Sequence, residues 1–171
     1  MVEMIIVIVV VGAIFAVGAL VLGRAFESYD LTQKTTEVDW QGRVAMERMV
    51  RELRDIRSAT ATDLVFSLTE IGFNDTDGNP ACFRLSGTTL QRDTEGPAAA
   101  CGTVNPPDPQ PLADNVVATT GLNFYYYQQD GSVAVSADQV YYITVALNVV
   151  ENSIGGSINE TYRVTLQPRR F

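Results

Sequence analysis

Residues 4–23 read MIIVIVVVGAIFAVGALVLG and form a run of twenty residues without a charge between Glu3 and Arg24. Seventeen of the twenty are Met, Ile, Val, Ala, Phe or Leu, and the other three are glycines. A helix of this length spans ~30 Å, which is the thickness of the hydrocarbon core of a bilayer. Because apolar residues cover every side of that helix, it needs lipid, or an equally apolar protein surface, around its whole circumference.

A secretory signal peptide and a plain membrane anchor are two common kinds of segment that contain such an apolar run. A secretory signal peptide has basic residues before its apolar run and a small-residue cleavage site after it. Here the acidic Glu3 precedes the run and Gly23-Arg24-Ala25-Phe26 follows it, so a signal peptide fits poorly. A plain membrane anchor fits the length and the composition, but it gives Glu3 no role.

The first eight residues, MVEMIIVI, resemble the start of mature type IV pilins and type II secretion pseudopilins, which typically begin Phe-Thr-Leu-Val-Glu. In that family a prepilin peptidase removes a leader and methylates the new N-terminus. Before assembly, the family's subunit is a single-span protein of the inner membrane. The assembly machinery then moves it into a filament. Met1 stands where the family usually has Leu, so we expect a leader and two further mature residues upstream.

The resemblance assigns filament assembly to Glu3 and to the N-terminus at Met1. The family's glutamate pairs with the terminal amine of a neighbouring subunit. An ionised carboxylate at the edge of an apolar phase is costly unless it is paired, so such a partner would also fix the axial register. The alternative is an acid that lies in the lipid headgroup region.

Glycines interrupt the apolar run at Gly12 and Gly18, where each costs up to about 1 kcal/mol relative to alanine. Small residues let helices approach closely, so we expect Gly12 and Gly18 to pack against other helices in a filament core. A further hypothesis is that the helix loosens near Gly18 and Gly23 when subunits assemble.

A charged amphipathic pattern continues the helix through residues 25–57. Apolar or small residues recur at three- and four-residue spacing and form one stripe: Val38, Gly42, Ala45, Met46, Met49, Leu53 and Ile56. No proline occurs before Pro80, so the sequence predicts one helix over residues 1–57, a rod of ~85 Å.

Residues 58–171 are predicted to form a β-rich head, and the fold class is therefore α+β. We expect strands at 64–73, 81–86, 88–92, 122–128, 132–135, 139–150 and 158–167. Four prolines between 106 and 111 predict irregular structure over residues 93–111. An antiparallel sheet with one face on the helix stripe is the simplest arrangement.

The composition excludes several classes of function. The formal charge is −8, of which −7 lies in residues 58–171, with 5 basic against 12 acidic residues. Such an acidic head argues against a broad nucleic-acid surface. There is no histidine and no Gly-x-Ser-x-Gly motif, so we expect no enzyme activity and no cofactor.

The chain has two cysteines, Cys82 and Cys101. In an exported domain they would form one structural disulfide, worth roughly 3 kcal/mol in the chain-entropy model. The redox alternative lacks a Cys-x-x-Cys spacing.

Three local features have a plain and a special interpretation. Asp75 and Asp77 resemble the opening of a calcium loop, but Ser86 stands where that loop needs a glutamate, so a turn is favoured over a metal site. The run FYYY at 124–127 is expected to point two rings into the core and two outward. Arg163, Arg169 and Arg170 make a weak DNA site on an acidic head, and a salt bridge between subunits is favoured.

Three segments narrow the resemblance to minor pilins and J-type pseudopilins: AMERMVRELR at 45–54, DTDG at 75–78 and PLADNV at 111–116. Minor members are suggested to prime or cap assembly, although a repeating subunit has the same appearance. The expected partners are therefore identical or related chains, and the expected location is the inner membrane and then an extracellular or periplasmic filament. A membrane-tethered binding or adhesin domain that does not polymerise is the alternative from another class.

Overall fold

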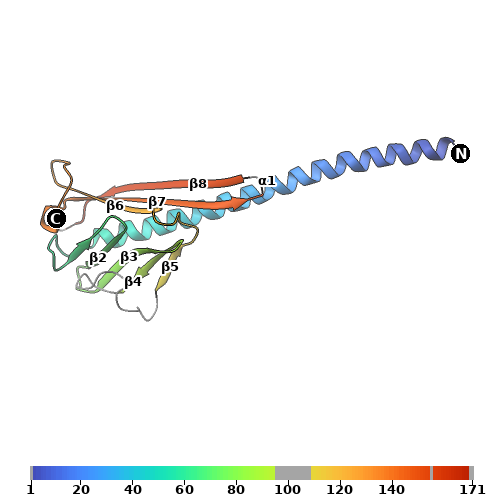
Figure 1. The fold of residues 1–171 in the computed structure, drawn as a ribbon. Helices are drawn as coiled ribbons and strands as arrows, with labels where there is room; N and C mark the ends of the chain where they lie inside the picture. Colours follow the sequence, from blue (N-terminus) through green and yellow to red (C-terminus); the bar gives the residue numbers. More distant parts are fainter. Residues whose placement is uncertain (1, 95–108, 155, 170–171) are drawn as a thin grey trace.

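The computed structural model describes residues 2–94, 109–154 and 156–169. One helix, α1 (Val2–Arg54), extends far beyond a head that packs against one side of its C-terminal half (Figure 1). At 1.5 Å per residue, its 53 residues form a rod of ~80 Å. The helix ends three residues before the predicted boundary, because the Asp55 amide donates to the Glu52 carbonyl and Ile56 then bridges to Asp75.

The head contains two antiparallel sheets rather than the one sheet that was predicted. The first sheet has the order β1-β2-β3-β4-β5, with β1 (Leu64–Phe66), β2 (Glu70–Asn74), β3 (Pro80–Ser86), β4 (Thr89–Asp93) and β5 (Gln110–Ala113). The second has the order β6-β7-β8, with β6 (Leu122–Tyr127), β7 (Tyr142–Ser153) and β8 (Gly156–Leu166). A short 3-10 helix, η1 (Ala137–Gln139), precedes β7.

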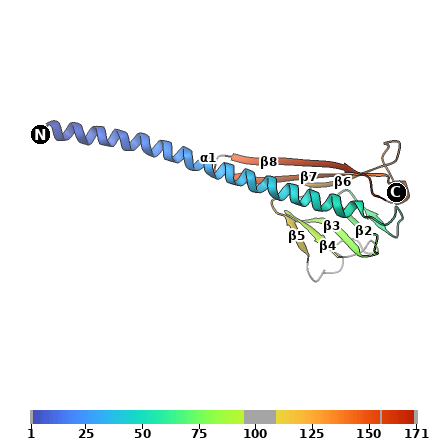
Figure 2. The same cartoon turned by 180° about the vertical axis from the view of Figure 1, so that it is seen from behind.

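The core lies where the two sheets meet α1 (Figures 1 and 2). The helix contacts β7 and β8 of one sheet and β5 of the other. The predicted stripe is confirmed, since all seven of its members are buried: Val38, Gly42, Ala45, Met46, Met49, Leu53 and Ile56. The α+β prediction, with a long helix packed on antiparallel sheet, is thereby confirmed.

The long β7–β8 hairpin lies along α1. Its ladder runs from Ile143 opposite Leu166 to Ser153 opposite Gly156. Alternate residues of β7 from Ile143 to Val149 are fully buried, as a strand with one face on a core requires. The strands predicted at 139–150 and 158–167 therefore exist. β7 begins three residues later than predicted because η1 occupies 137–139, and both strands extend closer to the turn between them.

The predicted strand at 64–73 is wrong in one respect, since the chain reverses at Ser67. The Ser67 hydroxyl accepts hydrogen bonds from the amides of Thr69 and Glu70, at 3.3 and 3.1 Å. This turn divides the segment into β1 and β2, which pair antiparallel with Leu64 opposite Phe73. A serine hydroxyl that binds the backbone two and three residues ahead favours a turn over a continuous strand.

A second correction concerns the proline-rich segment. Residues 95–108 lie outside the described part of the chain, but Pro111 lies within β5, where irregular structure was predicted. β5 is at the edge of its sheet, where a residue without an N–H group loses no ladder hydrogen bond on its open side.

The predicted hairpin after β6 forms its turn and a short stretch of pairing, in which the Ala134 amide donates to the Tyr126 carbonyl at 2.9 Å. The Gln128 amide donates to the Ser132 carbonyl, and Gly131 has a φ of +84°. Tyr127 and Val133 form an isolated bridge, so residues 132–135 are not the second strand that was predicted. Val133 and Val135 are exposed, and Ala134 is the buried residue between them.

Candidate functional site

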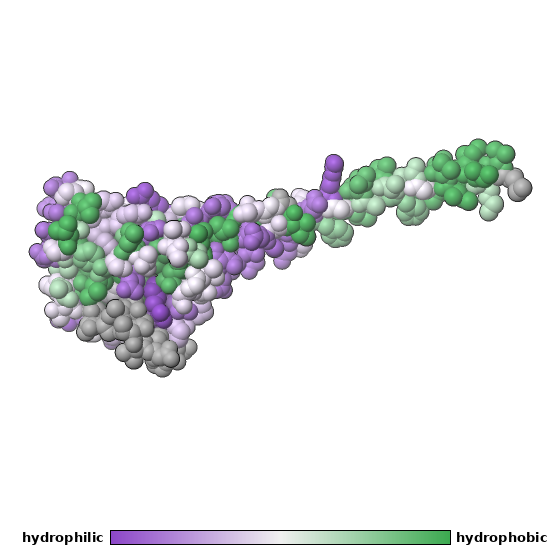
Figure 3. All heavy atoms as spheres, in the orientation of Figure 1, coloured by the Kyte–Doolittle hydropathy of each residue, from purple (hydrophilic) through white to green (hydrophobic). Residues whose placement is uncertain are grey.

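The most unusual surface of the molecule is the N-terminal part of α1. Every residue from 2 to 29 is exposed, and Figure 3 shows this part as an apolar rod that leaves a mostly hydrophilic head. Within the described residues, α1 is the helix that is long and apolar enough to cross a membrane. Its most apolar stretch has no buried residue, so none of the described segments of the chain covers this surface.

Glu3 lies in the first turn of α1, among exposed apolar neighbours. In the described part of the chain, no cation forms an ion pair with its carboxylate. The helix N-terminus favours a negative charge there, but an apolar medium makes an unpaired carboxylate costly. Met1, the other residue assigned to assembly, lies outside the described residues.

Gly12 and Gly18 contact no other segment among the residues that the structure describes. A Cβ atom built at either position has nothing within 4 Å. Gly42 differs, because a Cβ there would lie 2.2 Å from the Tyr162 ring. The fold of the single chain therefore requires glycine at position 42, and it does not require glycine at positions 12 and 18.

An exposed aromatic face on α1 was not predicted. Phe26, Tyr29 and Trp40 are all strongly exposed and recur at helical spacing on the side of α1 opposite the buried stripe. Tyr29 and Trp40 border a shallow groove that is also lined by Thr32, Gln33, Thr36 and Glu37 of the same helix. The three- and four-residue spacing of positions 26, 29, 33, 36 and 40 could have predicted this face. The predicted stripe follows the more regular apolar pattern at Met46–Ile56 instead.

Asp30 marks the point on α1 where contact with the head begins. Its carboxylate accepts hydrogen bonds from the Ser153 hydroxyl at 2.8 Å and from the Ile154 amide at 3.1 Å. These two hydrogen bonds, with a smaller contribution from Lys34, hold the pKa of Asp30 below its usual value although burial opposes them. Lys34 also donates to the Asn152 carbonyl at 2.6 Å. The turn of the β7–β8 hairpin is thus attached to the helix.

A second polar attachment lies one step further along α1. Asp39 accepts hydrogen bonds from Arg43 at 2.8 Å and from the Tyr162 hydroxyl at 3.2 Å. The Arg43 hydrogen bond is the main cause that lowers the pKa of Asp39. Burial, and then the hydrogen bond to Asp39, raise the pKa of Tyr162 to about 12. The same tyrosine covers Gly42, so one residue of β8 provides both packing and a polar contact.

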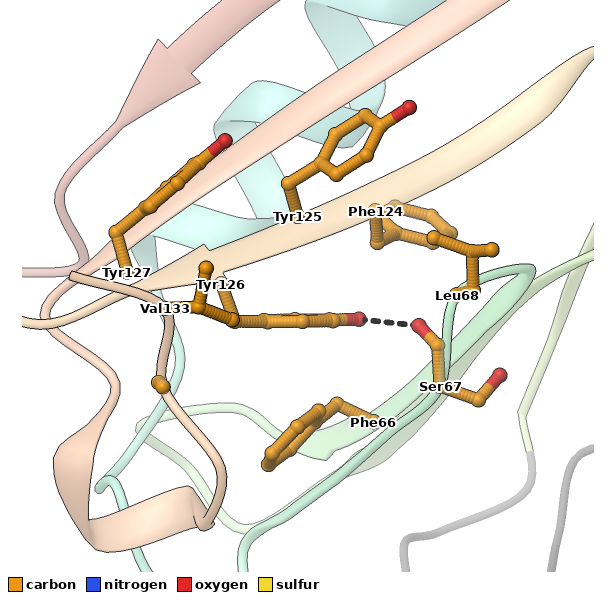
Figure 4. A pocket seen from close by; sticks show the side chains of 9 residues that line it. Phe66, Ser67, Leu68, Phe124, Tyr125, Tyr126, Tyr127 and Val133 are labelled. Carbon is orange, nitrogen blue, oxygen red and sulfur yellow. Dashed lines mark hydrogen bonds between the residues drawn. The ribbon is translucent and has the colours of Figure 1, made fainter. Parts of the chain in front are cut away.

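A pocket of about 250 Å³ lies between β1 and β6, which belong to different sheets (Figure 4). β6 pairs with the N-terminal part of β7, at the end of the head away from the apolar rod (Figure 1). It is lined by residues of β1, β6 and the loops that follow them: Phe66, Ser67, Leu68, Phe124, Tyr125, Tyr126, Tyr127, Val133 and Ala134. The rings of Phe66 and Tyr126 lie 4.4 Å apart between their centroids. The Tyr126 hydroxyl donates to the Ser67 carbonyl at 3.0 Å, and the pocket lining is mostly apolar.

The expected alternation of the FYYY segment is confirmed. Phe124 and Tyr126 are buried, whereas Tyr125 is exposed and Tyr127 is partly exposed. Arg163 lies over the Tyr125 ring, 5.6 Å from its centroid. The sequence predicted which rings face inward, but not that Tyr126 meets a loop of the other sheet.

Asp75 closes a turn. Its carboxylate accepts hydrogen bonds from the Asp77 amide at 2.9 Å and from the amide and side chain of Asn79, at 2.8 and 3.1 Å. Burial raises the pKa of Asp75, but these hydrogen bonds outweigh it and the pKa is lowered overall. The carboxylate that a cation would need is therefore occupied by the turn, which was the favoured interpretation.

Cys82 is buried in β3 and is disulfide-bonded. Its predicted partner, Cys101, lies outside the described residues. In the sheet, Cys82 lies opposite Gly72 of β2 and Asp93 of β4. The Asp93 carboxylate accepts a hydrogen bond from Arg84 at 2.6 Å.

Of the C-terminal arginines, Arg169 pairs within its own chain, 3.4 Å from Asp55. The Arg169 amide also donates to the Arg54 carbonyl at 3.0 Å, so the chain returns to the end of α1 after β8. The pairing of these arginines between subunits stays a prediction. Arg170 lies outside the described residues.

No protein-family model matches this chain, and no curated protein matches it either.

Proposed function

We propose that this chain is a structural subunit of a type IV pilus-like filament. The observation that carries the proposal is the apolar surface of residues 4–23, exposed on every side of a continuous helix whose other half holds a folded head. A surface of this kind is stable in lipid or against similar helices, and it is unstable in water.

The proposed mechanism moves one surface between two apolar environments. Before assembly the helix spans the inner membrane with the head outside it. On assembly, neighbouring helices replace lipid around residues 4–23, so the amount of apolar surface exposed to water hardly changes and the transfer costs little. The heads then form the outer wall of an extracellular or periplasmic filament.

Glu3 sets the axial register in this mechanism. Its carboxylate pairs with the N-terminal amine of an adjacent subunit, which offsets the cost of placing a charge among apolar residues. Only one stagger between neighbouring helices brings the two groups together. Gly12 and Gly18, which have no role within the single chain, allow the close helix contacts of the filament core.

A second candidate is a membrane-tethered binding or adhesin domain. The observation that favours it is the apolar pocket at the end of the head farthest from the rod, where a tethered domain would meet a target. Within the filament family, the role of a minor pseudopilin that primes or caps a secretion filament is the remaining alternative, and the abundance of the chain in sheared fibres distinguishes it from a major subunit.

The test replaces Glu3. In a strain that produces the chain, Glu3→Ala and Glu3→Gln should leave the protein in the membrane fraction and abolish its recovery in sheared fibres. Glu27→Ala is the matched control, since Glu27 is also an exposed acid on α1 but lies outside the apolar run. Glu27→Ala should assemble normally. Normal assembly of Glu3→Ala would contradict the proposal.

A further inference from the structure

The turn of the β7–β8 hairpin is the part of the head that lies closest to the apolar rod (Figures 1 and 2). The Ser153 hydroxyl and the Ile154 amide donate to the Asp30 carboxylate at 2.8 and 3.1 Å, so the turn is held at the level of Asp30. Asp30 follows Gly23 by seven residues, which is ~10 Å along the helix axis. The apolar tip of the turn, Ile154, is thereby fixed at a defined height beyond the apolar run.

Exposed apolar side chains surround α1 at this height. Phe26 and Tyr29 are each 70% exposed, Leu31 is 39% exposed and Ile154 is 75% exposed, and we call these four residues the apolar collar. Phe26 and Leu31 are five residues apart, which is about 140° around the helix, so the collar is not one face. A protein seated on one side of the helix would cover part of the collar, whereas a lipid layer through which the helix passes meets all of it.

The height of the collar matches the headgroup layer of a bilayer. The hydrocarbon core is ~30 Å thick and the bilayer with its headgroups ~40–45 Å, so the headgroup layer reaches roughly 5–7 Å beyond Gly23. Phe26 lies ~4–5 Å beyond Gly23. Tyr29 lies ~9 Å beyond it, but helical side chains point back toward the N-terminus, which brings the ring to the layer. A tilt of ~20° toward the hairpin, within the range of spanning helices, lowers Ile154 by a few ångströms to the same layer.

The charges at this height suit a lipid surface without net charge. Arg24, Glu27, Asp30 and Lys34 sum to zero. Asp30 is bound to the hairpin turn, and Lys34 lies 3.8 Å from Glu151, the remaining acid beside the turn. Arg24 and Glu27 have no ion pair among the described residues. They lie ~1.5 and ~6 Å beyond the apolar run, where the phosphate and ammonium groups of a zwitterionic lipid are available as partners.

We propose that the near end of the head docks on the bilayer surface through the apolar collar, with Ile154 inserted in the headgroup layer beside Phe26 and Tyr29. Tyrosine favours this layer because its ring is apolar and its hydroxyl is polar. The docking fixes the tilt of the span and the height of the head before assembly. This inference rests on the membrane stage of the proposed function and names a lipid surface as the partner of this end of the head.

Tryptophan quenching tests the contact in the full chain. Trp40 is the one tryptophan in the sequence, so Trp40→Phe gives a background without any. In that background, Ile154→Trp is the probe, and Val135→Trp is the matched control, since Val135 is 80% exposed and lies outside the collar. In phosphatidylcholine vesicles with bromine atoms high on the acyl chains, Ile154→Trp should lose about half of its emission relative to unbrominated vesicles. Val135→Trp should lose none.

A third variant separates this inference from the proposed function. Phe15→Trp in the same background places a tryptophan at an exposed position within the apolar run, and bromine atoms deep in the acyl chains should quench it. Quenching at position 15 without quenching at position 154 would overturn the docking and leave the membrane span of the proposed function intact. If position 15 is not quenched either, the chain has no span, and the proposed function and the docking fail together.

Two further outcomes would overturn the docking. Equal quenching of Ile154→Trp and Val135→Trp would mean that the head lies on lipid without a preferred end. The competing occupant of the collar is a second copy of this chain. In that case the emission of Ile154→Trp would move to shorter wavelength without bromine quenching, and the move would be lost when the lipid-to-protein ratio is raised about tenfold. With lipid as the neighbour, quenching at position 154 should stay the same on that dilution.

Discussion

The two halves of α1 have the same backbone and opposite surroundings. Leu20, in the N-terminal half, is 69% exposed, whereas Leu53, in the C-terminal half, is fully buried. Both are leucines in one continuous helix, so neither local propensity nor composition separates them. The head therefore buries the apolar side chains of only one half of α1. The apolar side chains of the other half need lipid, or other copies of the chain, to be removed from water.

The glycines repeat this contrast. Gly42 is required because the Tyr162 ring lies where a side chain would begin, and Gly18 faces open space. On the same helix, contacts within the head therefore explain the glycine at position 42, whereas no such contact explains the glycine at position 18.

The largest expected effect comes from the leucine pair. Leu53→Ala should lower the free energy of unfolding of the head by about 3 kcal/mol, through lost burial and a cavity. Leu20→Ala should leave it unchanged, because Leu20 contacts no part of the head. Denaturant unfolding of the full chain in detergent, followed by the near-ultraviolet circular dichroism of its tyrosines, measures both. Equal losses for the two variants would break the comparison between the two halves.

The glycine pair should give a smaller effect. Gly42→Ala should destabilise the head by about 2 kcal/mol, because its Cβ would force the Tyr162 ring away from the helix. Gly18→Ala should not destabilise the head, and it should raise the helix content in detergent because alanine is favoured by up to about 1 kcal/mol. The same unfolding measurement, with far-ultraviolet circular dichroism for helix content, distinguishes them. A stable Gly42→Ala head would show that Tyr162 moves aside freely.

The smallest effect concerns Asp30, where the exposed half meets the head. Its pKa is lower in the folded chain than the ordinary 3.8, so its contribution to stability is complete above pH 3.8 and is lost as the pH falls through the lower folded value. The Ile154 amide signal in a nuclear magnetic resonance titration should therefore shift with a midpoint below 3.8. Asp30→Asn should remove that shift. A midpoint at or above 3.8 would mean that the hairpin turn is not attached to the helix in solution.

Much of the fold was predictable because it depends on local periodicity. The helix and its buried stripe, the β7–β8 hairpin and the inward rings of the FYYY segment all follow from spacings of three to four or of two residues. The errors concern features without such a period. The break at Ser67 depends on one hydroxyl that binds two amides, and the place of Pro111 in a strand depends on β5 being at an edge.

The candidate site divides in the same way. The apolar run and Glu3 could be identified from the sequence. A helix that is apolar on every side is recognised from its own residues, without knowledge of what packs against it. The pocket was not visible, because Phe66 and Tyr126 are sixty residues apart and belong to different sheets. The exposed aromatic face at Phe26, Tyr29 and Trp40 lies between these cases, since its helical spacing was present and only its exposure was unknown.

The sequence alone determined that residues 4–23 must leave water, that the helix continues beyond them, and that the remainder is rich in strands. These properties depend on neighbours along the chain. Only the tertiary structure decided that two sheets share one helix, that Tyr162 lies on Gly42, and that an apolar pocket and an apolar tip occupy opposite ends of the head. These features are set by contacts between segments far apart in the chain, whose pairing no local pattern specifies.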